Sequence, residues 1–202
     1  MQPFAHTCRL TCALLSVSVS GCTLLASDES VLRREFGIPS GARVVRLESR
    51  PKQGEGGWFG REGLAIQATF QLSDSDFKQY AAMASSSGQW KPLPIPKVFL
   101  RRMAAIETAK QSRVAFSQQS GQALPPEGSI DNPTEQQRLA SFVASLPAQP
   151  SSGLFQVRTA GNDIMRAPKT VRQNLDRDLN DFMLAMLDDT SKQILIKVST
   201  RY

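Results

Sequence analysis

The chain has 202 residues, of which 41% are hydrophobic and 21% are charged, and its formal net charge is +6. This length suits one domain of ordinary size, and no apolar run reaches the roughly 20 residues that cross a bilayer. The only cysteines, Cys8, Cys12 and Cys22, and the only histidine, His6, lie at the start of the chain. Loss of residues 1–21 would therefore exclude an internal disulfide framework, a Ser-His-Asp or Cys-His mechanism, and the usual histidine-containing zinc or iron sites.

Residues 1–21 are predicted to be a targeting segment rather than part of a fold. Arg9 and the terminal amine supply positive charge, and an apolar stretch of signal-peptide length follows over residues 10–19. An ordinary secretory signal and a short buried helix are the alternative interpretations.

The tetrapeptide Val19-Ser20-Gly21-Cys22 resembles the lipobox of bacterial lipoproteins, in which an aliphatic residue, a small residue and Gly or Ala precede a cysteine. The resemblance covers the first 22 residues alone. It implies cleavage between Gly21 and Cys22, a diacylglyceryl thioether on Cys22, and acylation of the freed amine. Each buried CH₂ contributes roughly 0.8 kcal/mol, so two or three acyl chains anchor a protein in effect permanently.

The residue after the lipobox indicates a destination. In this family an Asp there resembles an inner-membrane retention signal, so Thr23 favours the outer membrane, with the protein facing the periplasm. Residues 22–27 are expected to be the lipidated N-terminus and a short tether. Residues 28–202 are expected to form one domain.

The first part of this domain contains the clearest local signals. Ser27 is suited to cap a helix over residues 31–36, which Gly and Pro stop. A strand is predicted over residues 43–49 and a polar turn over 50–57. In residues 64–72 apolar and other side chains alternate without error, which predicts a strand with one buried face.

The middle of the chain favours helices. Residues 73–76 are suited to start a helix that reaches about residue 84, with Phe77, Tyr80, Ala81 and Ala84 on one face. An extended connection at 90–96, a helix over 97–109 and a loop over 117–132 are predicted next.

Asn132, Pro133 and Glu135 indicate the start of another helix, as its cap, its first residue and an acid in the first turn. This helix is expected to reach about residue 145. Its expected buried face is formed by Leu139, Phe142 and Val143.

The C-terminal part favours strands. One is predicted over residues 153–160, and 182–187 and 194–200 are predicted to form a hairpin around a turn at 188–192. Residues 176–187 also suit a helix, but strand is preferred for 182–187. The predicted fold is a single α+β domain with a mostly antiparallel sheet of about five strands and three to four helices.

The most unusual local composition is Gly56 to Gly63, where Trp58 and Phe59 lie among glycines beside Arg61 and Glu62. Two aromatic rings next to an Arg-Glu pair suit the stacking of a sugar or a peptide. The alternative is a turn before a strand, with the rings covering the sheet edge.

Two motifs point weakly to catalysis or metal binding. Ser75 and Lys78 match the Ser-x-x-Lys pattern of penicillin-interacting enzymes, but its companion Lys-Thr-Gly is missing and Ser75 suits a helix start. Asp176, Asp178 and Asn180 alternate as calcium ligands do, without the central Gly and closing Glu of a calcium loop. We therefore predict no cofactor and no metal.

A glycosidase needs two carboxylates about 5 to 10 Å apart. The carboxylates weighed for such a pair are Glu55, Glu62, Asp163, Asp176, Asp178, Asp188 and Asp189. Sequence spacing does not place any two of them across a cleft.

Basic residues form two clusters in the sequence. The 24 basic residues less Arg9 leave 23 against 18 acidic residues, a net charge of +5 after cleavage. The clusters are Lys97, Arg101, Arg102, Lys110 and Arg113, and Arg166, Lys169, Arg172 and Arg177. Near a membrane they suit anionic head groups or envelope polymers, and a solvated face is the alternative.

The sequence therefore favours a lipid-anchored envelope lipoprotein that acts as a non-enzymatic binding or structural module. Its expected partners are the membrane, through Cys22, and an envelope protein or polymer, with no nucleic acid. The alternative is a hydrolase that acts on envelope carbohydrate through paired carboxylates.

Overall fold

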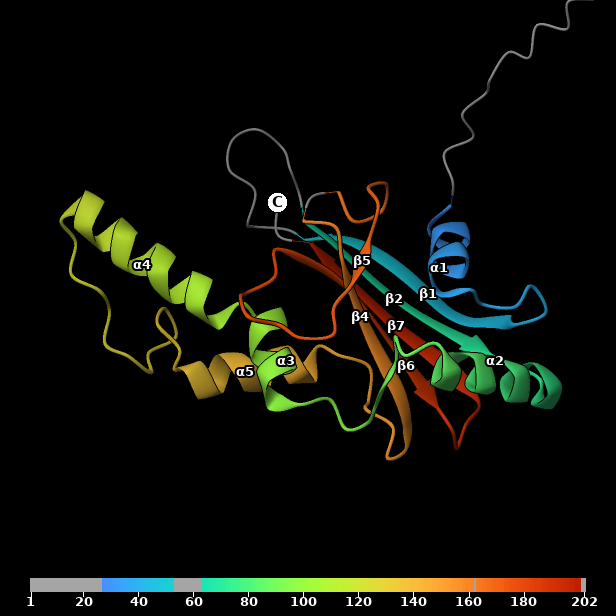
Figure 1. The fold of residues 1–202 in the computed structure, drawn as a ribbon. Helices are drawn as coiled ribbons and strands as arrows, with labels where there is room; N and C mark the ends of the chain where they lie inside the picture. Colours follow the sequence, from blue (N-terminus) through green and yellow to red (C-terminus); the bar gives the residue numbers. More distant parts are fainter. Residues whose placement is uncertain (1–26, 53–62, 162, 201–202) are drawn as a thin grey trace, which may run out of the picture.

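The computed structural model describes residues 27–52, 63–161 and 163–200 (Figure 1). In chain order the elements are α1 (Asp28–Phe36), β1 (Arg43–Lys52), β2 (Gly63–Gln71), α2 (Asp74–Ser86), β3 (Lys91–Pro92), α3 (Lys97–Met103), α4 (Ile106–Ser120), α5 (Glu135–Ala144), β4 (Gly153–Thr159), β5 (Thr170–Val171), β6 (Asp181–Asp188) and β7 (Gln193–Thr200).

The seven strands form one sheet in the order β1-β2-β7-β6-β4-β3, with β5 paired to β4. Every pairing of the named strands is antiparallel. The predicted single α+β domain with a mostly antiparallel sheet is therefore confirmed. The strands are more numerous than predicted because β3 and β5, of two residues each, carry no periodic signal.

One face of the sheet is covered by α1 and α2. The alternate β2 side chains Ile66, Ala68 and Phe70 are buried beneath them, as the period of two predicts. Tyr80 of α2 donates its hydroxyl to the carbonyl oxygen of Phe36 in α1 at 2.7 Å. This hydrogen bond joins the two helices over the core.

The other face is covered over β4 and β6 by α3, by α5, and by residues of the segments before α3, after α5 and before β6. Phe99 of α3 packs edge-on against Phe155 of β4, with ring centroids 5.5 Å apart, and Phe142 of α5 packs on Phe182 of β6 at 6.0 Å. Strand β6 therefore has apolar neighbours on both faces and is buried along most of its length. The predicted hairpin of β6 and β7 is confirmed, and strand was the correct choice for residues 182–187.

The first two helix starts follow the predicted local chemistry. The Ser27 hydroxyl accepts a hydrogen bond from the Ser30 amide at 3.2 Å, and Ser73 accepts one from the Asp76 amide at 3.1 Å. Strand β1 extends to Lys52, three residues into the predicted turn.

The single helix predicted over residues 97–109 is wrong. The chain forms two helices, because Ala105 adopts a left-handed conformation (φ 45°) between α3 and α4. Helix α4 then continues to Ser120, into the predicted loop over 117–132. Its Ser- and Gln-rich last turn suggests a loop, but the first helix-stopping residue is Gly121.

The predicted start and buried face of α5 are also wrong. Thr134, not Asn132, caps the helix, in a reciprocal pair of hydrogen bonds with Gln137. No α5 residue is fully buried, and Val143 is 36% exposed. The helix packs on the sheet through Phe142 alone of the three predicted residues.

Candidate functional site: a projecting helical arm

The predicted binding residues Trp58, Phe59, Arg61 and Glu62 lie outside the described residues. The lipobox residues Gly21 and Cys22 lie outside them as well. The structure therefore does not place either predicted site.

The Ser-x-x-Lys motif lies at the start of α2. The Ser75 hydroxyl is 3.0 Å from the hydroxyl of the helix cap, Ser73, and Lys78 is exposed on the helix. The position of Ser75 in the first turn of α2 explains its presence in the sequence without a catalytic role.

Most of the described carboxylates that the sequence singles out are engaged in structural contacts. Asp178 forms an ion pair with Arg102 at 3.2 Å, and Asp188 accepts hydrogen bonds from Thr190 and Ser191 in its turn. Within the described ranges, no group of three His, Cys, Asp or Glu residues is placed to hold a metal. The sequence offers Asp178 as a possible calcium ligand. In the structure its carboxylate is engaged instead by Arg102 and the Thr108 amide.

Several residues of the two basic clusters form ion pairs with acidic residues. Arg101 contacts both Glu107 and Glu135, while Arg102 pairs with Asp178. In the second cluster, Lys169 is buried against Glu35. Neighbouring acids thus offset much of the charge that the sequence groups together.

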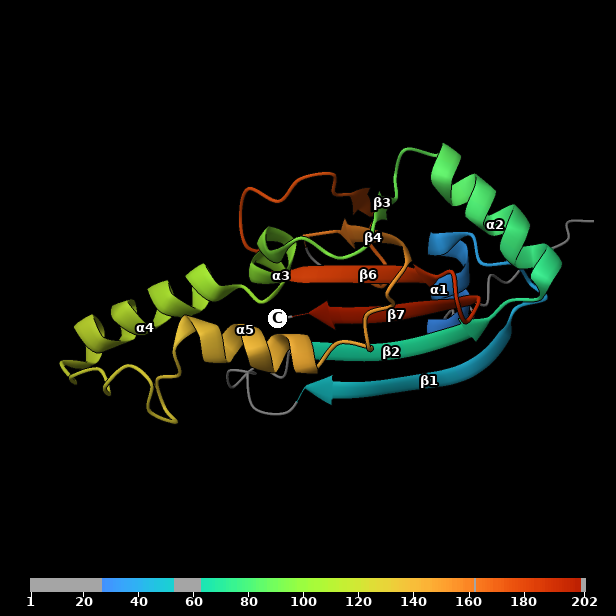
Figure 2. The same cartoon turned by 90° about the horizontal axis from the view of Figure 1, so that it is seen from below.

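Helix α4, the loop 121–134 and α5 form a helical hairpin that we call the arm (residues 106–144); α5 packs on the sheet and α4 projects from it. Figures 1 and 2 both show α4 extending away from the sheet beyond the end that α3 covers. Ile106, at its base, is the one buried residue of α4. Most of this helix therefore packs on nothing but the rest of the arm.

The base of the arm is fixed by Asp178, from the segment before β6. Its carboxylate accepts a hydrogen bond from the Thr108 amide at 2.8 Å and pairs with Arg102 of α3. Ala105, the residue before α4, offers no side-chain cap. Asp178 therefore acts as the N-terminal cap of α4, although it comes from another segment of the chain.

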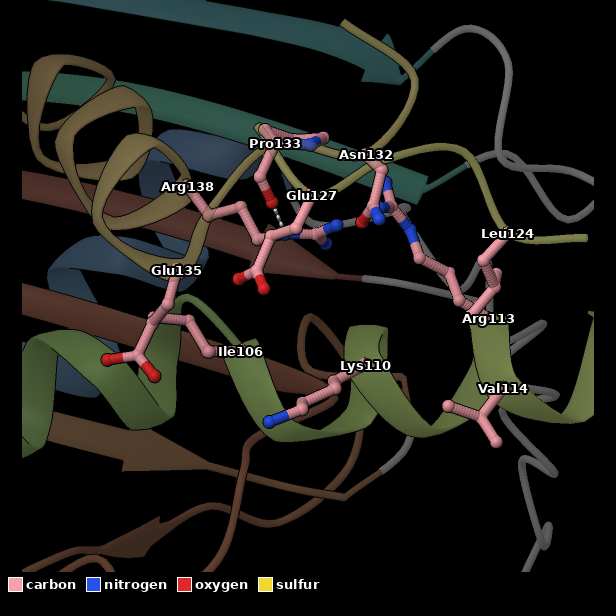
Figure 3. Close-up of a pocket in the computed structure, with 10 residues that line it drawn as sticks. All are labelled: Ile106, Lys110, Arg113, Val114, Leu124, Glu127, Asn132, Pro133, Glu135 and Arg138. Atoms are coloured by element: carbon pink, nitrogen blue, oxygen red, sulfur yellow. Dashed lines mark hydrogen bonds between the residues drawn. The ribbon is translucent and has the colours of Figure 1, made fainter. Parts of the chain in front are cut away.

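A pocket of about 220 Å³ lies between the two arm helices (Figure 3). Figure 3 shows Arg113 extending from α4 toward Asn132 in the loop, and the two side chains are hydrogen-bonded. Arg138 of α5 donates from Nε to the Pro133 carbonyl oxygen at 3.0 Å. Burial and the nearby charge of Arg113 lower the pKa of Arg138, while Glu127 opposes this shift. These contacts hold the loop against both helices.

Two carboxylates, Glu127 and Glu135, also line this pocket. Both residues are exposed, and Glu135 is bound by Arg101. A glycosidase acid requires a carboxyl whose pKa is raised, usually by loss of solvent. Because both side chains are exposed to solvent, the hydrolase alternative gains no support from the arm.

The arm also carries exposed apolar side chains. These are Val114 (42% exposed), Phe116 (62%), Leu124 (42%) and Ile130 (98%). Phe116, Leu124 and Pro125 line a second, mostly apolar pocket of about 300 Å³. Single exposed apolar residues are common, but a group on a projecting element is typical of an interaction site.

Sequence reasoning missed this surface because Leu124 and Ile130 fall in the segment predicted as a polar loop. The available signal was the occurrence of isolated apolar residues among Ser, Gln, Gly and Pro. That pattern alone does not tell a loop from the tip of a helical hairpin.

Comparisons of the sequence with protein-family models and with curated proteins, and of the structure with solved structures, give no match. The class of protein is therefore given by the fold alone: a single α+β domain with an antiparallel sheet. Across the described residues, each helix is too short or too polar to span a bilayer.

Proposed function

We propose that the protein is a lipid-anchored bacterial envelope lipoprotein. In this proposal it binds a partner protein through the exposed apolar residues of its arm. The observation that carries the binding role is the exposure of Phe116 and Ile130 on an element that projects from the domain. Burial of such side chains in a complex contributes roughly 25 cal/mol per Å² of apolar surface.

The proposed anchor and the arm are compatible in space. Helix α1 begins at Asp28, six positions after Cys22, so the domain would lie close to the lipid surface. Figures 1 and 2 show α1 well along the sheet from the end where α4 projects. A domain tethered through α1 can therefore present its arm away from the anchor, and we place it on the periplasmic face of the outer membrane.

The anchor is tested by labelled palmitate in a Gram-negative host that expresses the wild type or Cys22→Ala. Label in the wild type alone supports the anchor. Equal label in both chains, or label in neither, contradicts it.

The binding role is tested by photo-crosslinking in intact cells from position 116 or 130. Position 83 is the matched control, because Met83 is 43% exposed on α2. We expect a discrete adduct from the arm positions alone, and we expect Ile130→Ser to remove the adduct formed from position 116. The same adducts from all three positions, or none from the arm, would overturn the proposal.

A further inference from the structure

Strands β1, β2 and β7 present a polar surface on the face opposite α1 and α2. Gln67 of β2 lies between Glu48 of β1 and Lys197 of β7 in one cross-strand row. Lys197 lies next to Leu184 of β6, which belongs to the core beneath α3 and α5. The row therefore runs from an exposed sheet edge to the border of an apolar core.

A pocket of about 200 Å³ lies on this surface. It is lined by Arg46, Glu48, Arg50, Ala65, Gln67 and Lys197. Of these residues, Gln67 is held in place by a hydrogen bond. Its side-chain amide donates to the carbonyl oxygen of Ser145, the residue after α5, at 3.0 Å.

The charges around this pocket are unbalanced. Arg46 makes two hydrogen bonds to Glu48, at 2.9 and 3.0 Å, and Arg50 contacts the same carboxylate at 3.2 Å. Lys197 is only 9% exposed, and among the described residues its ammonium group has no hydrogen-bond or ion-pair partner. Among the described residues that line it, three cations thus face the pocket with one carboxylate.

The charged form of a largely buried lysine beside an arginine is unfavourable unless an anion offsets it. Burial and, to a smaller extent, the charge of Arg46 lower the pKa of Lys197. The outer N–H groups of the two arginines remain at the rim, since Arg46 and Arg50 expose 51% and 77% of their side chains.

We propose that this pocket binds a phosphate group, with Lys197 at its inner end and Arg46 and Arg50 at its rim. The excess of two positive charges matches a phosphate monoester, which carries a charge of about −1.5 to −2 near neutral pH. Guanidinium groups bind phosphate oxygens with paired N–H donors, and an ammonium binds them as a point charge. The phosphate belongs either to a small soluble ester or to a lipid head group.

The site is tested with the full chain in a neutral detergent, titrated with inorganic phosphate at constant ionic strength and followed by calorimetry. Lys197→Met and Arg50→Gln are expected to weaken saturable binding about tenfold or more each. If Lys197→Met fails to fold, Arg50→Gln still tests the site, because Arg50 is exposed and its replacement should not affect folding. Lys78→Met, which removes an exposed lysine from α2, should bind as the wild type does.

Absence of saturable phosphate binding overturns the proposal, as does equal weakening by Lys78→Met. The source of the phosphate is assigned by sedimentation with phosphatidylcholine vesicles that contain or lack phosphatidic acid. Here every chain carries Cys22→Ala, so that no lipid anchor brings it to the vesicles. Binding that requires both phosphatidic acid and Lys197 assigns a lipid head group, whereas binding of inorganic phosphate alone assigns a soluble ester. The site does not depend on the proposed anchor or on the arm.

Discussion

Glu35 of α1 and Lys169 are 134 positions apart in the sequence, yet their carboxylate and ammonium atoms lie 3.2 Å apart. The Lys169 side chain is 2% exposed and also donates to the Ala167 carbonyl oxygen at 2.9 Å. Arg158 of β4 approaches the same carboxylate at 3.6 Å. One glutamate therefore offsets two largely buried cations and joins α1 to the segment between β4 and β5.

Removal of this carboxylate should destabilise the domain strongly. We expect Glu35→Gln to lower the free energy of unfolding by about 3 kcal/mol, because it leaves Lys169 buried without its counter-charge. Urea denaturation measures the change. Glu48→Gln is the matched control and should have little effect, since its ion pairs are exposed. Equal losses in the two variants would contradict the structural role of Glu35.

Asp178 should control the arm more than the sheet. We expect Asp178→Ala to cost about 1–2 kcal/mol, because it removes the cap of α4 and the partner of Arg102. Amide hydrogen exchange should become faster in α4 and stay unchanged in β6 and β7. Asp176→Ala, an exposed neighbour, should not alter exchange in either place. Uniformly faster exchange in the Asp178 variant would show that the residue supports the whole domain instead.

Tyr80 should make the domain sensitive to alkali. Burial raises the pKa of its hydroxyl above the usual 10.0, while the charge of Arg158 opposes this shift to a smaller extent. The folded state therefore keeps this proton at pH values where the unfolded chain loses it, and stability falls as pH rises above about 10. Below that pH, Tyr80→Phe should lower the free energy of unfolding by about 1 kcal/mol, because the hydrogen bond to the Phe36 carbonyl oxygen is lost.

Because phenylalanine does not ionise, the stability gap between wild type and Tyr80→Phe should narrow from about pH 8 to about pH 11. Urea denaturation across this interval measures the gap. A constant gap would mean that the Tyr80 pKa is not raised.

Gly153, the first residue of β4, should tolerate no side chain. Its φ is +130°, and an added Cβ would lie 1.9 Å from the carbonyl oxygen of Leu187 in β6. We expect Gly153→Ala to cost about 3 kcal/mol or more in thermal or urea unfolding. Gly88→Ala is the control: its φ is +65° with open space around it, so only the backbone cost of about 1–2 kcal/mol applies. A smaller loss at Gly153 than at Gly88 would rule out the close approach to Leu187.

The parts of the fold that the sequence predicts are those determined by neighbouring residues. The alternation in β2 and the serine caps at Ser27 and Ser73 depend on contacts within a few positions, and the structure reproduces them. The start of α4 is capped instead by Asp178, which lies 70 positions beyond Thr108. No local pattern contains that information.

The same limit applies to the candidate sites. Phe116 and Ile130 are ordinary residues in the sequence, and their exposure on the arm becomes apparent only in the structure. Lys197 occupies a polar position of an alternating strand, and its pocket exists because β1 and β2 pair beside β7. The aromatic and glycine-rich segment over 56–63, by contrast, is conspicuous in composition, and all of it except Gly63 lies outside the described residues.

Strand β7 occupies an interior position in the sheet, between β2 and β6, although it follows every other described strand in the chain. A chain that is synthesised from its N-terminus therefore cannot complete this sheet until residues 193–200 are available. Until then β2 and β6 each keep an unpaired edge open to chaperones. The architecture thus makes the joining of the two halves of the sheet depend on a single late strand.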